Sequence, residues 1–152
     1  MRMRNPKDKD EVLNSCDFYL DENLFNNNNN PIHMEIGMGK GDFILNMALK
    51  YPNVNFIGVE KYSSVACVAI KKIRNYKLNN LKIMILDACD LPEYLYSAID
   101  TIYLNFSDPW PKARHEKRRL THENYLKVYD KLFNKKCHII MKTDNDDLFE
   151  FS

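Results

Sequence analysis

Short apolar runs alternate with amphipathic segments along most of the chain, and this alternation restricts the possible folds more than any other feature. The run at residues 32–36 is mostly apolar, which is typical of a strand buried on both faces of a parallel sheet. In the segment that follows it, Phe43, Ile44 and Met47 recur at the spacing of an amphipathic helix. The pattern predicts a doubly wound, mainly parallel Rossmann-like α/β sheet with helices on both faces.

The same pattern predicts strands at residues 32–36, 54–59, 81–86, 101–106 and 137–141. Helices are expected after each of the first two strands, and a short helix is expected at residues 91–98. A further helix is expected after Thr121, which is a good N-cap residue, with Tyr125 and Phe133 on its buried face.

A single domain is expected, because 152 residues with a hydrophobic fraction of 45% are enough for one core. Residues 31–152 are expected to form this domain. Residues 1–30 are polar and are expected to be a surface extension with one short amphipathic piece at residues 17–25. No apolar run is long enough to cross a membrane, and the first ten residues are too polar for a signal peptide. We therefore expect a cytoplasmic protein without a membrane partner.

The composition by itself favours neither a metal site nor a polyanion partner. The net charge is +1, so a nucleic-acid partner has to be inferred from a local cluster of charges. The four cysteines are scattered without a CxxC pair, which argues against a zinc site and against a disulfide framework. We expect reduced thiols and no metal.

An acidic residue lies at or just after the end of each expected strand. These residues are Glu35, Glu60, Asp87, Asp108 and Asp144. The carboxyl ends of parallel strands meet at one edge of the sheet, which is where such folds bind their ligands. One acid after a strand is most often a helix cap or a solvated loop residue, but five in succession favour a binding site.

Three of the four glycines fall within five residues, at Gly37, Gly39 and Gly41. A dinucleotide-binding turn has the spacing GxGxxG, and Asp42 stands where its third glycine would be. A nicotinamide dehydrogenase is therefore the weakest alternative. The spacing E-x-G-x-G-x-G is instead typical of S-adenosylmethionine-dependent methyltransferases, in which the backbone passes close to the amino-acid part of the cofactor.

Two of the acids fit that cofactor. Glu35, beside the glycines, suits a ligand that carries ammonium and sulfonium charges. Glu60, about 20 residues beyond the glycines, suits hydrogen bonds to the two ribose hydroxyls. The order of glycine turn, Glu60 and Asp87 supports the cofactor more strongly than the turn alone.

A basic segment, residues 112–119, follows the fourth expected strand. It holds five Lys or Arg residues and one acid, and such a patch on a nearly neutral protein is typical of a polyanion-binding surface. A solvated charged turn is the alternative. Trp110, the only tryptophan, lies between two prolines and is either a packed hinge or a stacking surface for a base, with packing slightly favoured.

Four motifs resemble those of bacterial tRNA (guanine-N7-)-methyltransferases. They are E-I-G-M-G-K-G-D-F at residues 35–43, G-V-E-K at 58–61, L-N-F-S-D-P-W-P-K-A-R-H-E-K-R-R-L at 104–120 and K-T-D-N at 142–145. The resemblance runs through nearly the whole chain. It implies a tRNA partner and transfer of a methyl group from S-adenosylmethionine to N7 of a guanine in the tRNA variable loop.

The resemblance also implies roles for individual residues. Lys112 and Asp144 would contact the substrate. The residues that would bind the cofactor are Glu35, Gly37, Gly39, Gly41, Glu60, Asp87 and Asp108, and those along the RNA are Arg114, His115, Lys117, Arg118 and Arg119. The family continues with further strands and a T-x-x-E motif, so the resemblance implies a domain that is incomplete at its C-terminus and leaves its last strand as an exposed edge.

N7 of guanine carries a lone pair and no proton, so its attack on a methyl group needs no general base. Asp108 and Asp144 are the expected catalytic residues, because a carboxylate stabilises positive charge that develops on the ring. Two alternatives stay open. One is a non-catalytic RNA-binding module, and the other is a methyltransferase for another nucleobase, whose usual D/N-P-P-Y/F tetrad is replaced here by D-P-W-P. The sequence does not distinguish a monomer from a homodimer.

Overall fold

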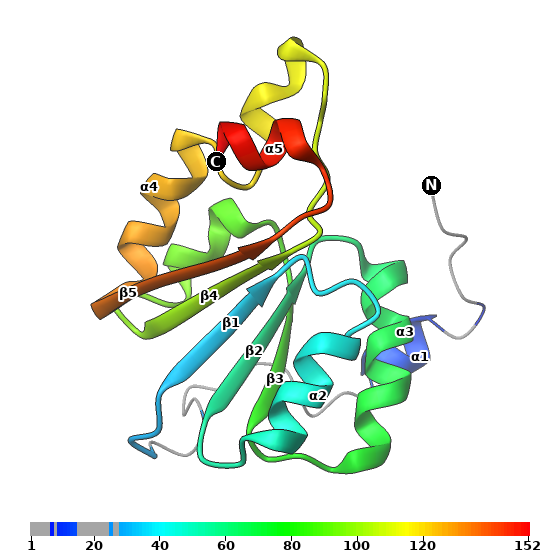
Figure 1. Ribbon diagram of the computed structural model, residues 1–152. Helices are drawn as coiled ribbons and strands as arrows, with labels where there is room; N and C mark the ends of the chain where they lie inside the picture. The colour runs from blue at the N-terminus through cyan, green and yellow to red at the C-terminus, as the bar shows by residue number, and fades with distance from the viewer. Residues whose placement is uncertain (1–6, 8, 15–24, 26–27) are drawn as a thin grey trace.

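A computed structural model describes residues 7, 9–14, 25 and 28–152. Its centre is a parallel five-stranded sheet with the strand order β3-β2-β1-β4-β5 (Figure 1). The predicted doubly wound α/β class is confirmed, and each expected strand is present within a few residues of its expected bounds. The strands are β1 (Ile32–Ile36), β2 (Asn55–Glu60), β3 (Leu81–Ile85), β4 (Ile99–Asn105) and β5 (Phe133–Lys142).

Helices cover both faces of the sheet, and each face has its own apolar core (Figure 1). Phe56 of β2 belongs to the core with Ile70 of α3, whereas its neighbour Ile57 belongs to the core with Tyr129 of α4. This division follows from the alternation of side chains along a strand. The main helices are α2 (Asp42–Lys50) and α3 (Ser63–Ile73) on one face and α4 (Glu123–Leu132) on the other.

The start of α4 differs from the prediction. The helix begins at Glu123, and its N-cap is His122, whose Nδ1 accepts a hydrogen bond from the Asn124 amide at 3.1 Å. The expectation that Thr121 caps this helix is therefore wrong. The Thr121 hydroxyl is instead 2.6 Å from the Ser152 hydroxyl, at the end of the short helix α5 (Asp146–Phe151).

Two further elements differ from their expected bounds. The short helix expected at residues 91–98 is a 3₁₀ helix at Ala88–Glu93. Phe133, expected on the buried face of the preceding helix, is the first residue of β5, which directly follows α4. Its side chain is still buried, so the sequence indicated its burial correctly and its element incorrectly.

The N-terminal segment contributes to the core instead of lying wholly at the surface. Within it, α1 (Lys9–Asn14) packs against α3, where Val12 is 2% exposed and the Lys9 ammonium donates a hydrogen bond to the Ser63 hydroxyl at 3.3 Å. Phe25 is also buried, although the rest of the amphipathic piece expected at residues 17–25 lies outside the described residues. The extension is thus attached to the domain at two points.

At the other end of the sheet order, β5 pairs with β4 and with no other strand of the described residues. Ile139 and Ile140, which point to opposite faces, are both more than two-fifths exposed, so the expected exposed edge is present. In the described part of the chain, no helix has the length and apolar character needed to cross a membrane.

Candidate functional site

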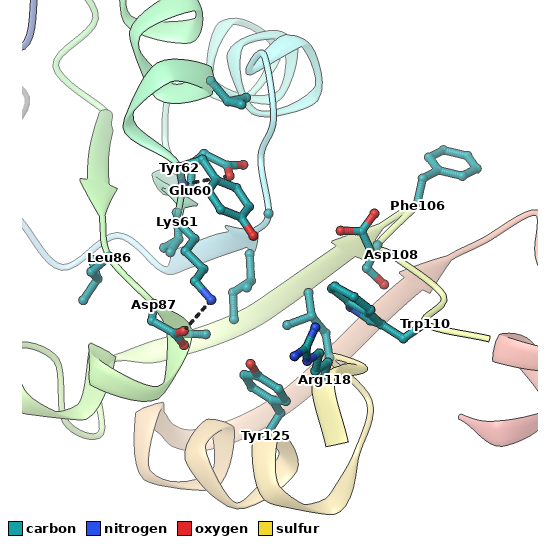
Figure 2. Close-up of a pocket in the computed structure, with 17 residues that line it drawn as sticks. Glu60, Lys61, Tyr62, Leu86, Asp87, Phe106, Asp108, Trp110, Arg118 and Tyr125 are labelled. Atoms are coloured by element: carbon teal, nitrogen blue, oxygen red, sulfur yellow. Dashed lines mark hydrogen bonds and ion pairs between the residues drawn. The ribbon is translucent and has the colours of Figure 1, made fainter. Parts of the chain in front are cut away.

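A cavity of about 650 Å³ lies at the carboxyl ends of the central strands (Figure 2). The strand order changes direction between β1 and β4, which is the place where open α/β sheets bind ligands. Five of the predicted site residues line this cavity together, namely Gly37, Glu60, Asp87, Asp108 and Arg118. The prediction that the acids of neighbouring strands converge is therefore confirmed for these strand ends.

The glycine loop, residues 37–41, connects β1 to α2. Gly37, Gly39 and Gly41 have φ angles of 76°, 58° and 81°, which side-chain-bearing residues adopt only at a cost. At Gly41 a Cβ atom would also lie 3.0 Å from the Cβ of Ala69 in α3. Gly37 lines the cavity, whereas Gly39 and Gly41 give the loop its shape.

Glu60 ties the glycine loop to the end of β2. Its side chain is buried, and its two oxygens accept hydrogen bonds from the Gly39 amide at 2.9 Å and from the Tyr62 amide at 3.2 Å. Each carboxylate oxygen can accept more than one hydrogen bond, so the group can also accept from a ligand in the cavity.

Asp87 follows β3 and has two partners. Its carboxylate lies 3.3 Å from the Lys61 ammonium (Figure 2). It also accepts a hydrogen bond from the Cys89 amide at 3.0 Å. Partial burial alone raises the pKa of Asp87, but the Cys89 amide and Lys61 together outweigh it and lower that pKa. Burial, with Asp87 nearby, raises the pKa of Tyr125 to about 12, so this phenol is a protonated group on the same wall.

Glu35 lies beneath the cavity and not on its lining. Its side chain is 2% exposed, and Oε2 accepts a hydrogen bond from Asn105 Nδ2 at 2.8 Å. Burial raises the pKa of Glu35 to about 7, with a further contribution from the negative charge of Glu60. Oε1 of Glu35 has no hydrogen-bond partner within the protein.

Most of the basic segment forms a 3₁₀ helix at Ala113–Arg118, and two arginines of the segment lie over aromatic rings. The Arg118 guanidinium lies 4.9 Å from the centre of the Trp110 ring and lines the cavity (Figure 2). Arg119 Nε donates to the Trp110 carbonyl at 3.1 Å, and its guanidinium lies over the ring of Phe151 in α5. Trp110 is half-buried and also lines the cavity, so both roles that the sequence offered for it, a packed hinge and a stacking surface, stay open.

The remaining predicted site residues lie away from the cavity lining. Lys112, Arg114, Lys117 and Asp144 are exposed, and none of them lines the cavity. His115 is half-buried against the Trp110 ring, with the ring centres 5.5 Å apart. The structure therefore separates the predicted residues into a group around the cavity and a group on the surface beside it.

The loop after β4 carries backbone strain at two residues with side chains. Phe106 and Trp110 have φ angles of 51° and 43°, in the left-handed region that favours glycine. Asp108 lies between them and lines the cavity, while the ring of Phe106 is 64% exposed and points away from the other lining side chains in Figure 2. Strain of this kind is often found at functional sites.

The sequence analysis missed several residues of the cavity lining. Lys61 and Tyr62 follow Glu60 directly, and their place next to a strand end could have identified them. Tyr125 was assigned to a helix face by periodicity, which gave no indication that its hydroxyl lies near Asp87. Among the described residues there is no group of three or more His, Cys, Asp or Glu side chains that could hold a metal ion.

Comparison with known proteins finds a family described as "Putative methyltransferase" that matches residues 29–152. A tRNA (guanine-N(7)-)-methyltransferase of Lachnoclostridium phytofermentans is 46% identical, with 100% of this chain and 75% of the relative covered. The enzyme of the same name from Bacillus subtilis is 42% identical, with 100% and 76% covered. Among solved structures, an antibiotic-related methyltransferase matches with a TM-score of 0.64 and 21% identity, over 96% of this chain and 68% of that chain.

Arg119→Ala is expected to loosen the loop around Trp110, because it removes the hydrogen bond to the Trp110 carbonyl. Trp110 is the only tryptophan, so its fluorescence reports on this loop alone. Its emission should shift to longer wavelength, and its quenching by acrylamide should increase. Arg114→Ala, at an exposed position of the 3₁₀ helix that precedes Arg119, is the matched control and should change neither value. Identical quenching of the Arg119→Ala variant and the wild type would show that this bond does not hold the loop.

Proposed function

The chain belongs to the tRNA (guanine-N(7)-)-methyltransferase family, and we propose that it transfers a methyl group from S-adenosylmethionine to N7 of a guanine in the tRNA variable loop, giving 7-methylguanosine. One observation carries the proposal for this chain. The cavity at the strand ends is lined by a glycine of the turn and by carboxylates from three further strand ends, in the order that the family motifs require.

The residues at this cavity fit S-adenosylmethionine, which supplies an electrophilic methyl group when bound. We propose that Glu60 accepts hydrogen bonds from the ribose hydroxyls and that Asp87 marks the adenine end of the cavity. Glu35 would serve the ammonium group, since its buried Oε1 has no partner within the protein. Gly37, Gly39 and Gly41 would let the backbone lie close to the amino-acid part, and Asp108 would lie near the transferred methyl group.

Methyl transfer to guanine N7 mainly requires that the protein position the reacting atoms. Guanine N7 attacks with its own lone pair, so no side chain has to remove a proton first. The product ring is cationic, and we assign Asp108 and Asp144 to stabilise that charge. Asp108 lies at the cavity, and Asp144 lies in the loop that follows the neighbouring strand β5. Most of the rate enhancement would come from holding the nucleophile, methyl carbon and sulfur in line.

The RNA would lie along the basic segment beside the cavity. Arg114 and Lys117 are exposed there and suit contact with phosphates, whereas Arg118 and Arg119 are engaged by Trp110 and Phe151. We assign Lys112 to the substrate nucleotide, and the segment Arg114–Arg119, which includes His115, to the RNA. We also propose that the protein is cytoplasmic. Both a monomer and a homodimer are compatible with this assignment.

The direct test is methyl transfer to unmodified tRNA, followed by identification and mapping of the modified nucleoside. The expected product is 7-methylguanosine in the variable loop. A methyl group on an exocyclic amine would instead support a methyltransferase for another nucleobase. Binding of S-adenosylmethionine and tRNA without turnover would support the RNA-binding module.

Glu60→Ala is expected to weaken cofactor binding by about 1–3 kcal/mol, the scale of lost hydrogen bonds to a charged acceptor. The loss also frees the Gly39 amide, so the loop and the ribose contact change together. Calorimetric titration with S-adenosylhomocysteine measures the effect without turnover. Glu93→Ala removes an exposed glutamate that does not line the cavity and should bind normally. Unchanged affinity in Glu60→Ala would contradict the assignment of Glu60 to the cofactor.

The double variant Arg114→Ala/Lys117→Ala is expected to weaken tRNA binding and to lower the salt dependence of the binding constant by about one unit of slope per side chain. Cofactor affinity should not change, because neither residue lines the cavity. Fluorescence anisotropy of labelled tRNA over a series of salt concentrations gives both quantities. Lys82→Ala, which removes a lysine of β3 outside the basic segment, is the control. A slope equal to that of the wild type would mean that the segment is only a solvated turn.

A further inference from the structure

Two buried acceptor atoms lie together beneath the cavity without a partner. Asn105, the last residue of β4, donates Nδ2–H to Oε2 of Glu35 at 2.8 Å. Oε1 of Glu35 and Oδ1 of Asn105 are both buried, and neither has a hydrogen-bond partner in the protein. A buried acceptor left in this state destabilises the folded protein, so the pair is suited to receive a donor that the protein itself does not supply.

Glu35 and Asn105 are next in sequence to residues that line the cavity. Ile36 and Gly37, which follow Glu35, line the cavity, and so does Phe106, which follows Asn105. The two side chains come from the neighbouring strands β1 and β4, which part at the point where the strand order changes direction. Both unpartnered atoms therefore belong to residues that directly precede the cavity lining in the chain.

We propose that Asn105 is a positioning residue for the cofactor, which holds Glu35 as the acceptor of the cofactor's ammonium group. This rests on the proposed function. The Asn105 amide fixes one carboxylate oxygen and leaves the other for the N–H groups of the ligand, either directly or through one water molecule. The same amide favours the ionised form of Glu35, because it donates to the charged carboxylate.

Cofactor binding is then coupled to a proton. Burial raises the pKa of Glu35 to about 7. The Asn105 amide from β4 opposes this rise, and the negative charge of Glu60 at the end of β2 adds to it. An ammonium group favours the carboxylate form, so binding displaces the proton. Affinity should therefore rise with pH up to about 7 and level off above it. At pH 7 about half a proton should be released, because a group at its pKa is half protonated.

The test is calorimetric titration of the folded chain with S-adenosylhomocysteine between pH 5.5 and 8, in buffers of different ionisation enthalpy. Asn105→Ala removes the donor and raises the pKa of Glu35 further. Its affinity should fall about tenfold for each unit of that rise at acidic pH, and the midpoint of its pH profile should move upward. Glu35→Gln cannot ionise and should release no proton.

Asn134→Ala is the matched control. Asn134 Nδ2 donates to the Asp100 carboxylate at 2.6 Å, so the same kind of bond is lost at the opposite end of the sheet. Asn134→Ala should leave the midpoint of the pH profile of cofactor affinity unchanged. Asn105→Asp, which is nearly isosteric, serves if Asn105→Ala does not fold, and it should also move the midpoint upward.

Two results would overturn the inference. One is a wild-type affinity that is independent of pH without proton release. The other is a loss of affinity in Asn105→Ala that is equal at every pH, which is what a purely structural role would give. If the wild-type chain does not bind S-adenosylhomocysteine at all, the proposed function itself fails, and this outcome is distinct from the other two.

Discussion

The repulsion between carboxyl groups gathered at one end of a parallel sheet is the constraint on which the rest of the site depends. Parallel strands deliver their last side chains to the same edge, and here several of those side chains are acidic. Three of these carboxylates have hydrogen-bond or ion-pair partners within the protein. The amides of Gly39 and of Tyr62, the N-cap of α3, donate to Glu60. Lys61 and a backbone amide hold Asp87, and Asn105 donates to Glu35.

These compensations link the shape of the site to its charge. The Glu60 carboxylate accepts from the Gly39 amide, so the group proposed to bind ribose also fixes the loop proposed to hold the amino-acid part. Of these three, Glu35 is countered least completely, because one of its oxygens has no partner, and burial raises its pKa to about 7. The weakest compensation thus occurs where a positively charged ligand is expected.

Most of the fold could be predicted from the sequence, because a buried parallel strand leaves a clear apolar signal and its end is marked by a turn. Element ends were less predictable. The N-cap of α4 is His122 and not the predicted Thr121, since both residue types can accept the amide hydrogen bond. Phe133 follows α4 without a connecting loop, and its burial fits a helix and a strand equally well.

The candidate site was predictable in part for a similar reason. Acids at strand ends converge whatever the details, so Glu60, Asp87 and Asp108 were found. The sequence did not show which residues of the basic segment contact the protein itself, because five positive charges in eight residues look alike. Arg118 lies over the Trp110 ring, and Arg119 contacts the Trp110 carbonyl and the Phe151 ring.

The left-handed backbone at Phe106 and Trp110 affects how any substitution there has to be interpreted. Residues with a Cβ pay about 1–2 kcal/mol in this region, and hydrogen bonds to Lys142 and from Arg119 help to hold the two residues in it. Glycine at Trp110 would remove the ring and at the same time relieve the backbone, so the two effects on stability would oppose each other. Alanine keeps the backbone cost, so the change from tryptophan to alanine reports what the indole ring contributes, and the difference between the alanine and glycine variants reports the backbone cost.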